Sequence, residues 1–173
     1  TKYSQDEALK LNALTEVLNI QIIEKVREEM GGIYGGGLFG SIVNRPYEHY
    51  TIASCIPAGR ENVGKLTGAL IDLIAKAQKE GVEQKDLDKV KETWKKQHRE
   101  NMESNDYWLT QLSNAWINRE DPEFVLNYEK KVDALTVKDL QEAAKKFLNL
   151  NEYIKVVLYP ENFKIPDSEK KAF

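Results

Sequence analysis

Apolar residues recur three or four positions apart along the first thirty residues of the chain. This spacing predicts a long amphipathic helix, because it places the side chains on one stripe of a helix with 3.6 residues per turn. Ser4 and Glu7 have the spacing of a capping box at its start, and Gly31 and Gly32 are a stop signal at its end. The stripe consists of Leu11, Leu14, Leu18, Ile22, Val26 and Met30.

Two segments with strand patterns follow this helix. Residues 33–43 are rich in glycine, and residues 47–56 alternate between the two faces of a strand. A turn sequence at residues 44–46 separates them. We therefore expect an antiparallel hairpin, in which the glycines need neighbouring strands or let another backbone come close. Cys55 lies in the apolar pattern of the second strand, which predicts a buried core thiol.

Helical spacing of apolar residues extends over most of the remaining chain. Trp108 and Trp116 belong to one of these helices, and we expect them in the core because large aromatic side chains usually anchor packing. Thr136 and Asp139 mark the capped start of another helix. The segment Tyr153–Tyr159 predicts a last strand. The expected helices begin near residues 63, 84, 107, 122 and 136.

The order of these elements predicts an α+β fold, with a mainly antiparallel sheet covered on one face by several helices. Three strands make a thin sheet, which strands missing from the front would extend. We expect one α+β domain over residues 1–160 and a loose tail over residues 161–173, which is rich in Lys, Glu and Asp. The chain passes from Thr1 almost directly into a helix, so we expect it to be a piece of a longer polypeptide.

The composition is that of an ordinary globular domain. The chain has 173 residues, of which 41% are hydrophobic and 31% charged, and its formal net charge is −3. This balance gives no electrostatic case for nucleic acid, which favours a basic face. No apolar run approaches the ~20 residues that a membrane-spanning helix needs. A single cysteine excludes an internal disulfide and a cysteine zinc cluster, and it leaves a periplasmic or a cytoplasmic location open.

Arg27 and Tyr34 are the candidate binding residues. Arg27 falls in the last turn of the first helix, where its charge complements the negative helix end and its planar fork can donate two parallel hydrogen bonds. Tyr34 follows seven residues later, just beyond the glycine break. A guanidinium and a phenol can thus meet at one helix–strand corner and donate to a carbonyl oxygen. The alternative is that Arg27 pairs with a nearby carboxylate and Tyr34 is an ordinary strand aromatic.

The run from Val26 to Gly35, VREEMGGIYG, resembles the C-terminal half-repeat of pitrilysin/insulinase-type zinc peptidases, the inverzincins. The resemblance covers most of the chain in the order of elements, and it implies a processing-peptidase-like half-repeat that lacks its first strands. In that family an arginine and a tyrosine at this spacing hold the substrate backbone from the half without metal. Arg27 and Tyr34 match those positions. The resemblance therefore implies a substrate-clamping, non-catalytic domain that acts on a peptide with a zinc-bearing N-terminal half or partner subunit.

The chain lacks the zinc motif of that family, which needs two histidines one helical turn apart and a glutamate between them. His49 and His98 are the only histidines in the sequence, and neither H-x-x-E-H nor H-E-x-x-H is present. His98 stands on a highly charged helix, so we expect it at the surface, and we expect His49 to be a strand residue. We expect no catalytic residue and no metal site in this chain, and zinc in the partner half.

Two glycine-containing segments resemble phosphate-binding motifs. Residues 35–40 fit G-x-G-x-x-G, but a helix precedes them and a strand pattern follows, which reverses the order of the dinucleotide-binding motif. Gly59–Thr67 lies between a strand and a helix, as a P-loop does, but Leu66 stands where Ser or Thr must bind magnesium. The alternatives to a peptidase domain are therefore a proteolytically inactive assembly subunit of the same fold and, less favoured, a nucleotide-binding domain at Gly59–Thr67.

Overall fold

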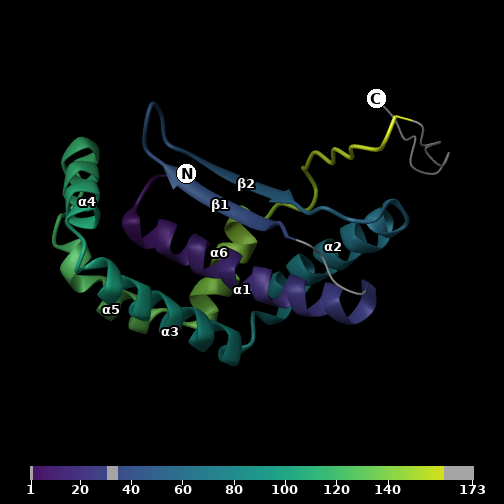
Figure 1. Cartoon of the computed structure of the whole chain (residues 1–173), viewed down its shortest axis with the longest axis horizontal. Coiled ribbons are helices and arrows are strands. Elements are labelled where there is room, and N and C mark those ends of the chain that lie inside the picture. The colour runs from purple at the N-terminus through teal and green to yellow at the C-terminus, as the bar shows by residue number, and fades with distance from the viewer. Residues whose placement is uncertain (1, 31–34, 162–173) are drawn as a thin grey trace.

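One long helix, α1 (Gln5–Met30), forms the centre of the computed structural model, and the other elements pack around it (Figure 1). The structure describes residues 2–30 and 35–161, without the side chains of residues 26–30 and of residue 60. The other elements are β1 (Gly37–Val43), β2 (His49–Cys55), the 3-10 helix η1 (Arg60–Asn62), α2 (Val63–Glu80), α3 (Gln84–Asn101), α4 (Asn105–Asn118), α5 (Phe124–Ala134) and α6 (Val137–Phe147).

The apolar stripe of α1 supplies the middle of the core. Leu11, Leu14 and Leu18 have no exposed surface, and Ile22 is also buried. The Ser4 hydroxyl oxygen caps the start of the helix, because it accepts a hydrogen bond from the Glu7 amide at 3.1 Å. The second half of the predicted capping box is not formed, since the Glu7 carboxylate pairs with Lys146 instead. The predicted stripe is thus confirmed for the part of α1 whose side chains are described.

The strands β1 and β2 form the predicted antiparallel hairpin, in which Gly37 lies opposite Cys55. Leu38 and Ile42 of β1 are buried against α1, whereas β2 is exposed along most of its length. Cys55 is exposed, so the predicted core thiol is wrong. The alternation of a strand marks two faces, and only contact with another layer decides whether a face is covered.

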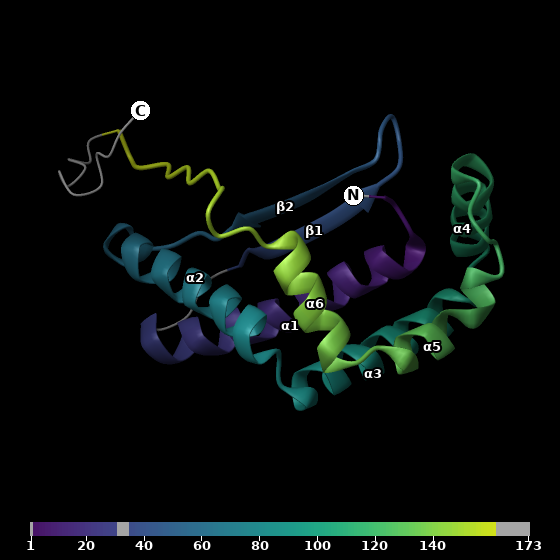
Figure 2. The ribbon, with the colours of Figure 1, turned by 180° about the vertical axis from the view of Figure 1, so that it is seen from behind.

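α1 packs against one face of the hairpin, and α3 and α5 lie on the far side of α1 (Figures 1 and 2). α1 contacts β1, α2, α3 and α6, and α3 pairs with α5. α6 begins at the predicted capping box of Thr136 and Asp139, and its Phe147 ring packs edge-on against Tyr50 of β2, with 5.2 Å between the ring centroids. The predicted α+β fold is confirmed, with a two-stranded sheet in the described part of the chain. None of the described helices is long and apolar enough to cross a membrane.

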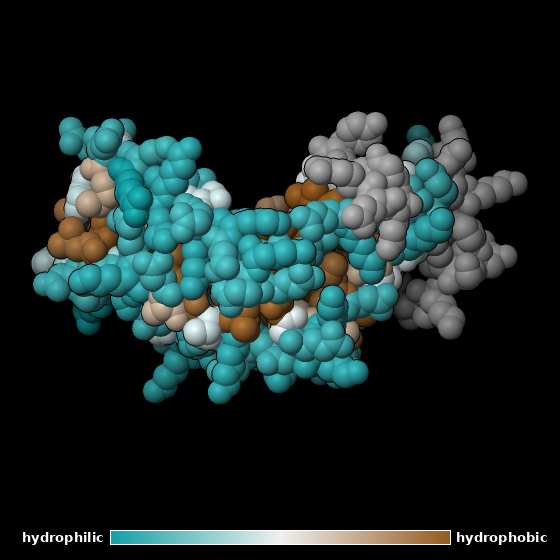
Figure 3. Space-filling view, turned by 90° about the horizontal axis from the view of Figure 1, so that it is seen from below, coloured by the Kyte–Doolittle hydropathy of each residue, from teal (hydrophilic) through white to brown (hydrophobic). Residues whose placement is uncertain are grey.

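Helix α4 projects from one end of the molecule, beyond the turn at residues 102–104 (Figure 1). Its Leu109 and Trp116 side chains are 68% and 87% exposed, and apolar side chains gather at this end in the space-filling view (Figure 3). Trp108 is partly buried, and its indole N–H donates to the Met102 carbonyl at 2.9 Å. The predicted core position is therefore wrong for Trp116. Helical spacing identifies an apolar face, but it does not say whether the same chain covers that face.

The predicted strand at Tyr153–Tyr159 is also wrong. These residues follow an extended course on the hairpin side of the molecule, but they form no strand (Figure 2). Ile154 and Leu158 are 91% and 93% exposed. A strand requires a neighbour for its backbone groups, and in the described part of the chain β1 and β2 pair only with each other.

Leu14→Ala tests the central position of α1. Leu14 is fully buried, so we expect the substitution to lower the free energy of unfolding by about 2–5 kcal/mol, through lost burial and the cavity it leaves. Leu158→Ala is the matched control, because that side chain is 93% exposed, and we expect it to change stability by less than about 0.5 kcal/mol. Urea denaturation followed by far-ultraviolet circular dichroism measures both, and equal losses would contradict the assignment of the core.

Candidate functional site

The first candidate site is the corner where α1 meets β1. The Asn19 carboxamide bridges both backbone groups of Leu38: its Oδ1 accepts from the Leu38 amide at 2.7 Å, and its Nδ2 donates to the Leu38 carbonyl at 3.0 Å. The carboxamide thus forms the two backbone hydrogen bonds that a neighbouring strand would form with Leu38. Its two bonds fix the position of the strand relative to the helix near the start of β1.

Glycines allow the close approach that this bridge needs. A Cβ atom on Gly37 would lie 2.6 Å from Oδ1 of Asn19, and one on Gly40 would lie 2.9 Å from Cγ of Leu11. Gly36 has a φ of +86°, and a Cβ atom there would collide with the backbone carbonyl of Cys55. The glycine-rich segment therefore lets side chains of α1 and the backbone at the end of β2 come close to it, as its composition predicts.

The predicted binding residues flank this corner in the sequence. The backbone of Arg27 belongs to the last turn of α1, but its side chain lies outside the described part of the structure. Tyr34 lies outside the described residues altogether. The convergence of the two side chains thus stays a prediction. Asn19 was not singled out from the sequence, where it is a polar residue beside the apolar stripe of α1.

Asn19→Ala tests the bridge. The substitution leaves the amide and the carbonyl of buried Leu38 without this partner, so we expect the free energy of unfolding to fall by about 1–3 kcal/mol. Asn114→Ala, on the exposed face of α4, is the control and should be close to neutral. Denaturant melts of the two variants measure the difference, and similar small effects would show that the bridge contributes nothing.

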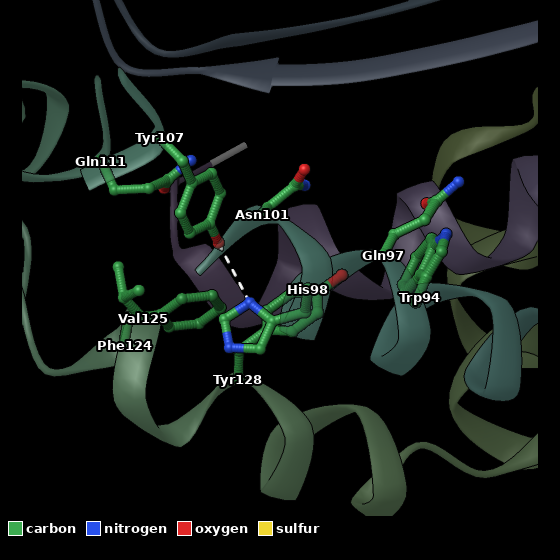
Figure 4. Close-up of a pocket in the computed structure, with 9 residues that line it drawn as sticks. All are labelled: Trp94, Gln97, His98, Asn101, Tyr107, Gln111, Phe124, Val125 and Tyr128. Carbon is green, nitrogen blue, oxygen red and sulfur yellow. Dashed lines mark hydrogen bonds between the residues drawn. The ribbon is translucent and has the colours of Figure 1, made fainter. Parts of the chain in front are cut away.

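The second candidate site is a pocket of about 240 Å³ between α3, α4 and α5 (Figure 4). Aromatic rings and carboxamides make up most of its wall, and one histidine lies among them. The lining residues are Trp94, Gln97, His98, Asn101, Tyr107, Gln111, Phe124, Val125 and Tyr128.

His98 is the buried polar residue of this pocket. It is only 6% exposed, its Nδ1 atom lies 3.0 Å from the Tyr107 hydroxyl oxygen, and its ring packs on Tyr128 with 4.8 Å between centroids. The predicted surface position is therefore wrong. The charged residues of α3 suggested a solvated helix, but His98 continues the inward stripe of Val90 and Trp94 at intervals of four residues, a signal that the sequence does contain.

The groups that line the pocket are uncharged near neutral pH. Burial lowers the pKa of His98, although the nearby Glu129 carboxylate acts in the opposite direction. Burial also raises the pKa of the Tyr107 hydroxyl, and it raises the pKa of Tyr128 to about 12. Arg99 does not line the pocket and is engaged outside it, where it donates two hydrogen bonds to Glu129 at 2.9 and 2.6 Å.

The lowered pKa of His98 makes stability depend on pH. The unfolded chain takes up the proton near pH 6.5 and the folded chain only at lower pH, so stability is full above that value and falls as pH drops from 6.5 toward the folded pKa. Glu129 and Asp139, whose pKa values are lowered, lose their contributions only at more acidic pH. We expect wild type to lose more stability than His98→Gln between pH 7 and pH 5, measured by urea denaturation. Parallel losses would contradict this assignment.

No candidate metal centre emerges from the described residues. Among them no group of three or more His, Cys, Asp and Glu side chains is placed to hold a metal ion. The two phosphate-binding candidates also lack the required context. Residues 37–43 form a strand where the dinucleotide motif requires a helix. The Glu61 carboxylate lies against the backbone of Gly59, where it would repel a phosphate.

The fold has close counterparts among solved peptidase structures. The chain aligns with the periplasmic protease PqqL from Escherichia coli at a TM-score of 0.65 and 19% identity, covering 86% of this chain and 16% of that one. It aligns with the peptidase M16 inactive domain from Pseudomonas fluorescens at a TM-score of 0.69 and 20% identity, covering 84% and 35%. An inactive peptidase domain from Bordetella parapertussis aligns at a TM-score of 0.62 and 13% identity, covering 92% and 88%.

These likenesses concern the fold, because all three identities are low. The chain spans about a sixth of the E. coli protease and about a third of the P. fluorescens protein. No family model and no curated protein sequence matches the chain. The fold expected from the inverzincin resemblance is thus present, and structures with this fold include peptidase domains described as inactive.

Proposed function

We propose that this chain is the non-catalytic, substrate-clamping domain of a zinc peptidase of the pitrilysin/insulinase (M16) type. The observation that carries the proposal is the agreement of the backbone likeness with the sequence motif. The backbone resembles M16 peptidase domains described as inactive, and the sequence places Arg27 and Tyr34 on either side of a glycine break between α1 and β1.

Arg27 and Tyr34 would hold the peptide by hydrogen bonds to a carbonyl oxygen near the scissile bond. A guanidinium and a phenol both donate, and such donors accelerate a reaction when they are fixed where negative charge develops. The bridge from Asn19 to Leu38 supports this role, because it holds the strand that follows Tyr34 against the helix that carries Arg27. Displacement of either element would move one donor relative to the other.

The zinc of such a peptidase would be bound by an N-terminal half or a partner subunit. A bound zinc ion supplies a Lewis acid and an activated water for peptide hydrolysis. The described residues of this chain hold no suitable ligand group, and the sequence lacks H-x-x-E-H. The contribution of this chain would therefore be to bind and orient the peptide that the zinc-bearing half cleaves.

Substitution of the two donors in the assembled enzyme, with its zinc-bearing half, tests the proposal. We expect Arg27→Ala and Tyr34→Phe each to lower kcat/KM for a fluorogenic peptide by about 10- to 1,000-fold, because each removes a donor to the developing charge. Zinc content, measured by mass spectrometry, should not change.

Arg119→Ala and Tyr153→Phe are the matched controls, because both residues are exposed and lie outside the α1–β1 corner. We expect their kcat/KM values to stay near wild type. If the Arg27 and Tyr34 variants behave like these controls, the clamping role is wrong, whatever the fold.

The second candidate function is an inactive assembly subunit of the same fold. The exposed apolar face of α4, with Leu109, Leu112 and Trp116, favours this alternative because large exposed apolar patches commonly mark interfaces. An assembly subunit would bind the zinc-bearing half without making peptide cleavage depend on Arg27 or Tyr34. The same kinetic comparison, combined with a pull-down of the two halves, separates the two functions.

A further inference from the structure

The pocket between α3, α4 and α5 gathers polar groups that have no partner within the described part of the protein. The carboxamides of Gln97, Asn101 and Gln111 make no hydrogen bond to a described residue, and neither does Nε2 of His98. Gln97 and Asn101 are exposed and Gln111 is half-buried, so water reaches these groups and a ligand would have to replace it. Their concentration around one pocket therefore indicates a place that can form several hydrogen bonds to a bound molecule.

Aromatic rings form the other part of the pocket wall. Trp94 and Phe124 flank Tyr128, with centroid distances of 6.5 and 6.2 Å, and the Tyr107 ring stands on the opposite side of His98 (Figure 4). Flat π surfaces favour planar ligands, because rings gain energy by offset stacking or edge-to-face contact. The wall thus combines ring surfaces with amide edges, the combination that proteins use to recognise bases.

The charges around the pocket disfavour anionic ligands. No Asp, Glu, Lys or Arg lines it. The basic residues next to lining residues in the sequence are paired: Arg99 with Glu129, Lys95 with Glu92 and Asp133, and Lys96 with Glu100. A phosphate or carboxylate on the ligand would find no free cation there, and no carboxylate lines the pocket to pair with a cationic ligand, so the pocket favours a neutral ligand.

The volume limits the size of the ligand. At about 240 Å³ the pocket is larger than an engineered cavity of about 150 Å³ that holds benzene, and smaller than the range of about 300–1,000 Å³ for drug-sized ligands. One fused ring system with polar edges fits between these limits.

We propose that this pocket binds an uncharged planar nitrogen heterocycle of the purine-base class. The rings would stack on its faces, and a carboxamide can pair with adjacent donor and acceptor atoms on its edge, as Asn and Gln do with adenine. The site is separate from the α1–β1 corner, so the inference does not depend on the peptidase role.

Nuclear magnetic resonance titration of the full chain with adenine tests the inference. The three tryptophans give three indole N–H signals, of which Trp94 lines the pocket and Trp116 lies on the exposed face of α4. Trp94→Phe assigns the first signal. We expect a saturable shift of the Trp94 signal with a Kd of about 1 mM or tighter, the range of a fragment-sized ligand, and no shift at Trp116.

Related probes separate the chemical classes. We expect adenosine 5′-monophosphate to bind no more tightly than adenine, because no free cation lines the pocket. Indole, a fused ring without an acceptor nitrogen, should bind at least about fivefold more weakly. Equal or tighter binding of indole would overturn the assignment to a heterocycle with a polar edge, and tighter binding of the phosphate would overturn the neutral class.

Gln111→Ala should weaken adenine binding about tenfold, through loss of one carboxamide pair. Asn114→Ala, which removes an amide of the same helix outside the pocket, should leave the Kd unchanged. Both side chains are at or near the surface, and thermal melts check that both variants stay folded. No saturable shift of Trp94 up to about 5 mM adenine, or equal affinities of the two variants, would overturn the proposal.

Discussion

The close contact between α1 and β1 is the constraint on which the rest of the structure depends. A two-stranded hairpin is marginal by itself in water, so β1 and β2 need another layer. α1 provides it through a stripe of fully buried leucines and through the carboxamide of Asn19, which bonds both backbone groups of Leu38. Glycines at 37 and 40 leave room for this approach. Apolar burial supplies most of the stabilisation, and the two directional bonds fix the relative position of helix and strand.

Patterns within single elements predicted those elements well. The stripe of α1, the hairpin, the capped start of α6 and the α+β class all follow from spacing along the chain. The five later helices begin within two residues of the positions expected. Such features depend on neighbours in sequence, which one chain displays directly.

The wrong predictions all concern whether another element covers a given face of a helix or strand. Residues of types that are usually buried are exposed at three places, because the described part of the chain does not cover them: Cys55, Trp116 and the segment Tyr153–Tyr159. His98 shows the reverse error. The charged residues of α3 predicted an exposed side chain, but His98 is buried against Tyr107 of α4 and Tyr128 of α5. The Asn19 bridge could not be predicted either, since its partner in β1 is distant in sequence. Arg27 and Tyr34 remain predictions from the sequence and the family resemblance.

The outer side of β2 has a consequence for handling the isolated chain. β2 pairs with β1 along one side only, and in the described part of the protein no third strand pairs with its other row of amides and carbonyls. Unshielded rows of this kind invite further strands from other molecules, and they underlie much of the aggregation of β-containing proteins. We therefore expect the isolated chain to aggregate more readily as its concentration rises. A partner that pairs with this edge of β2 would oppose the aggregation.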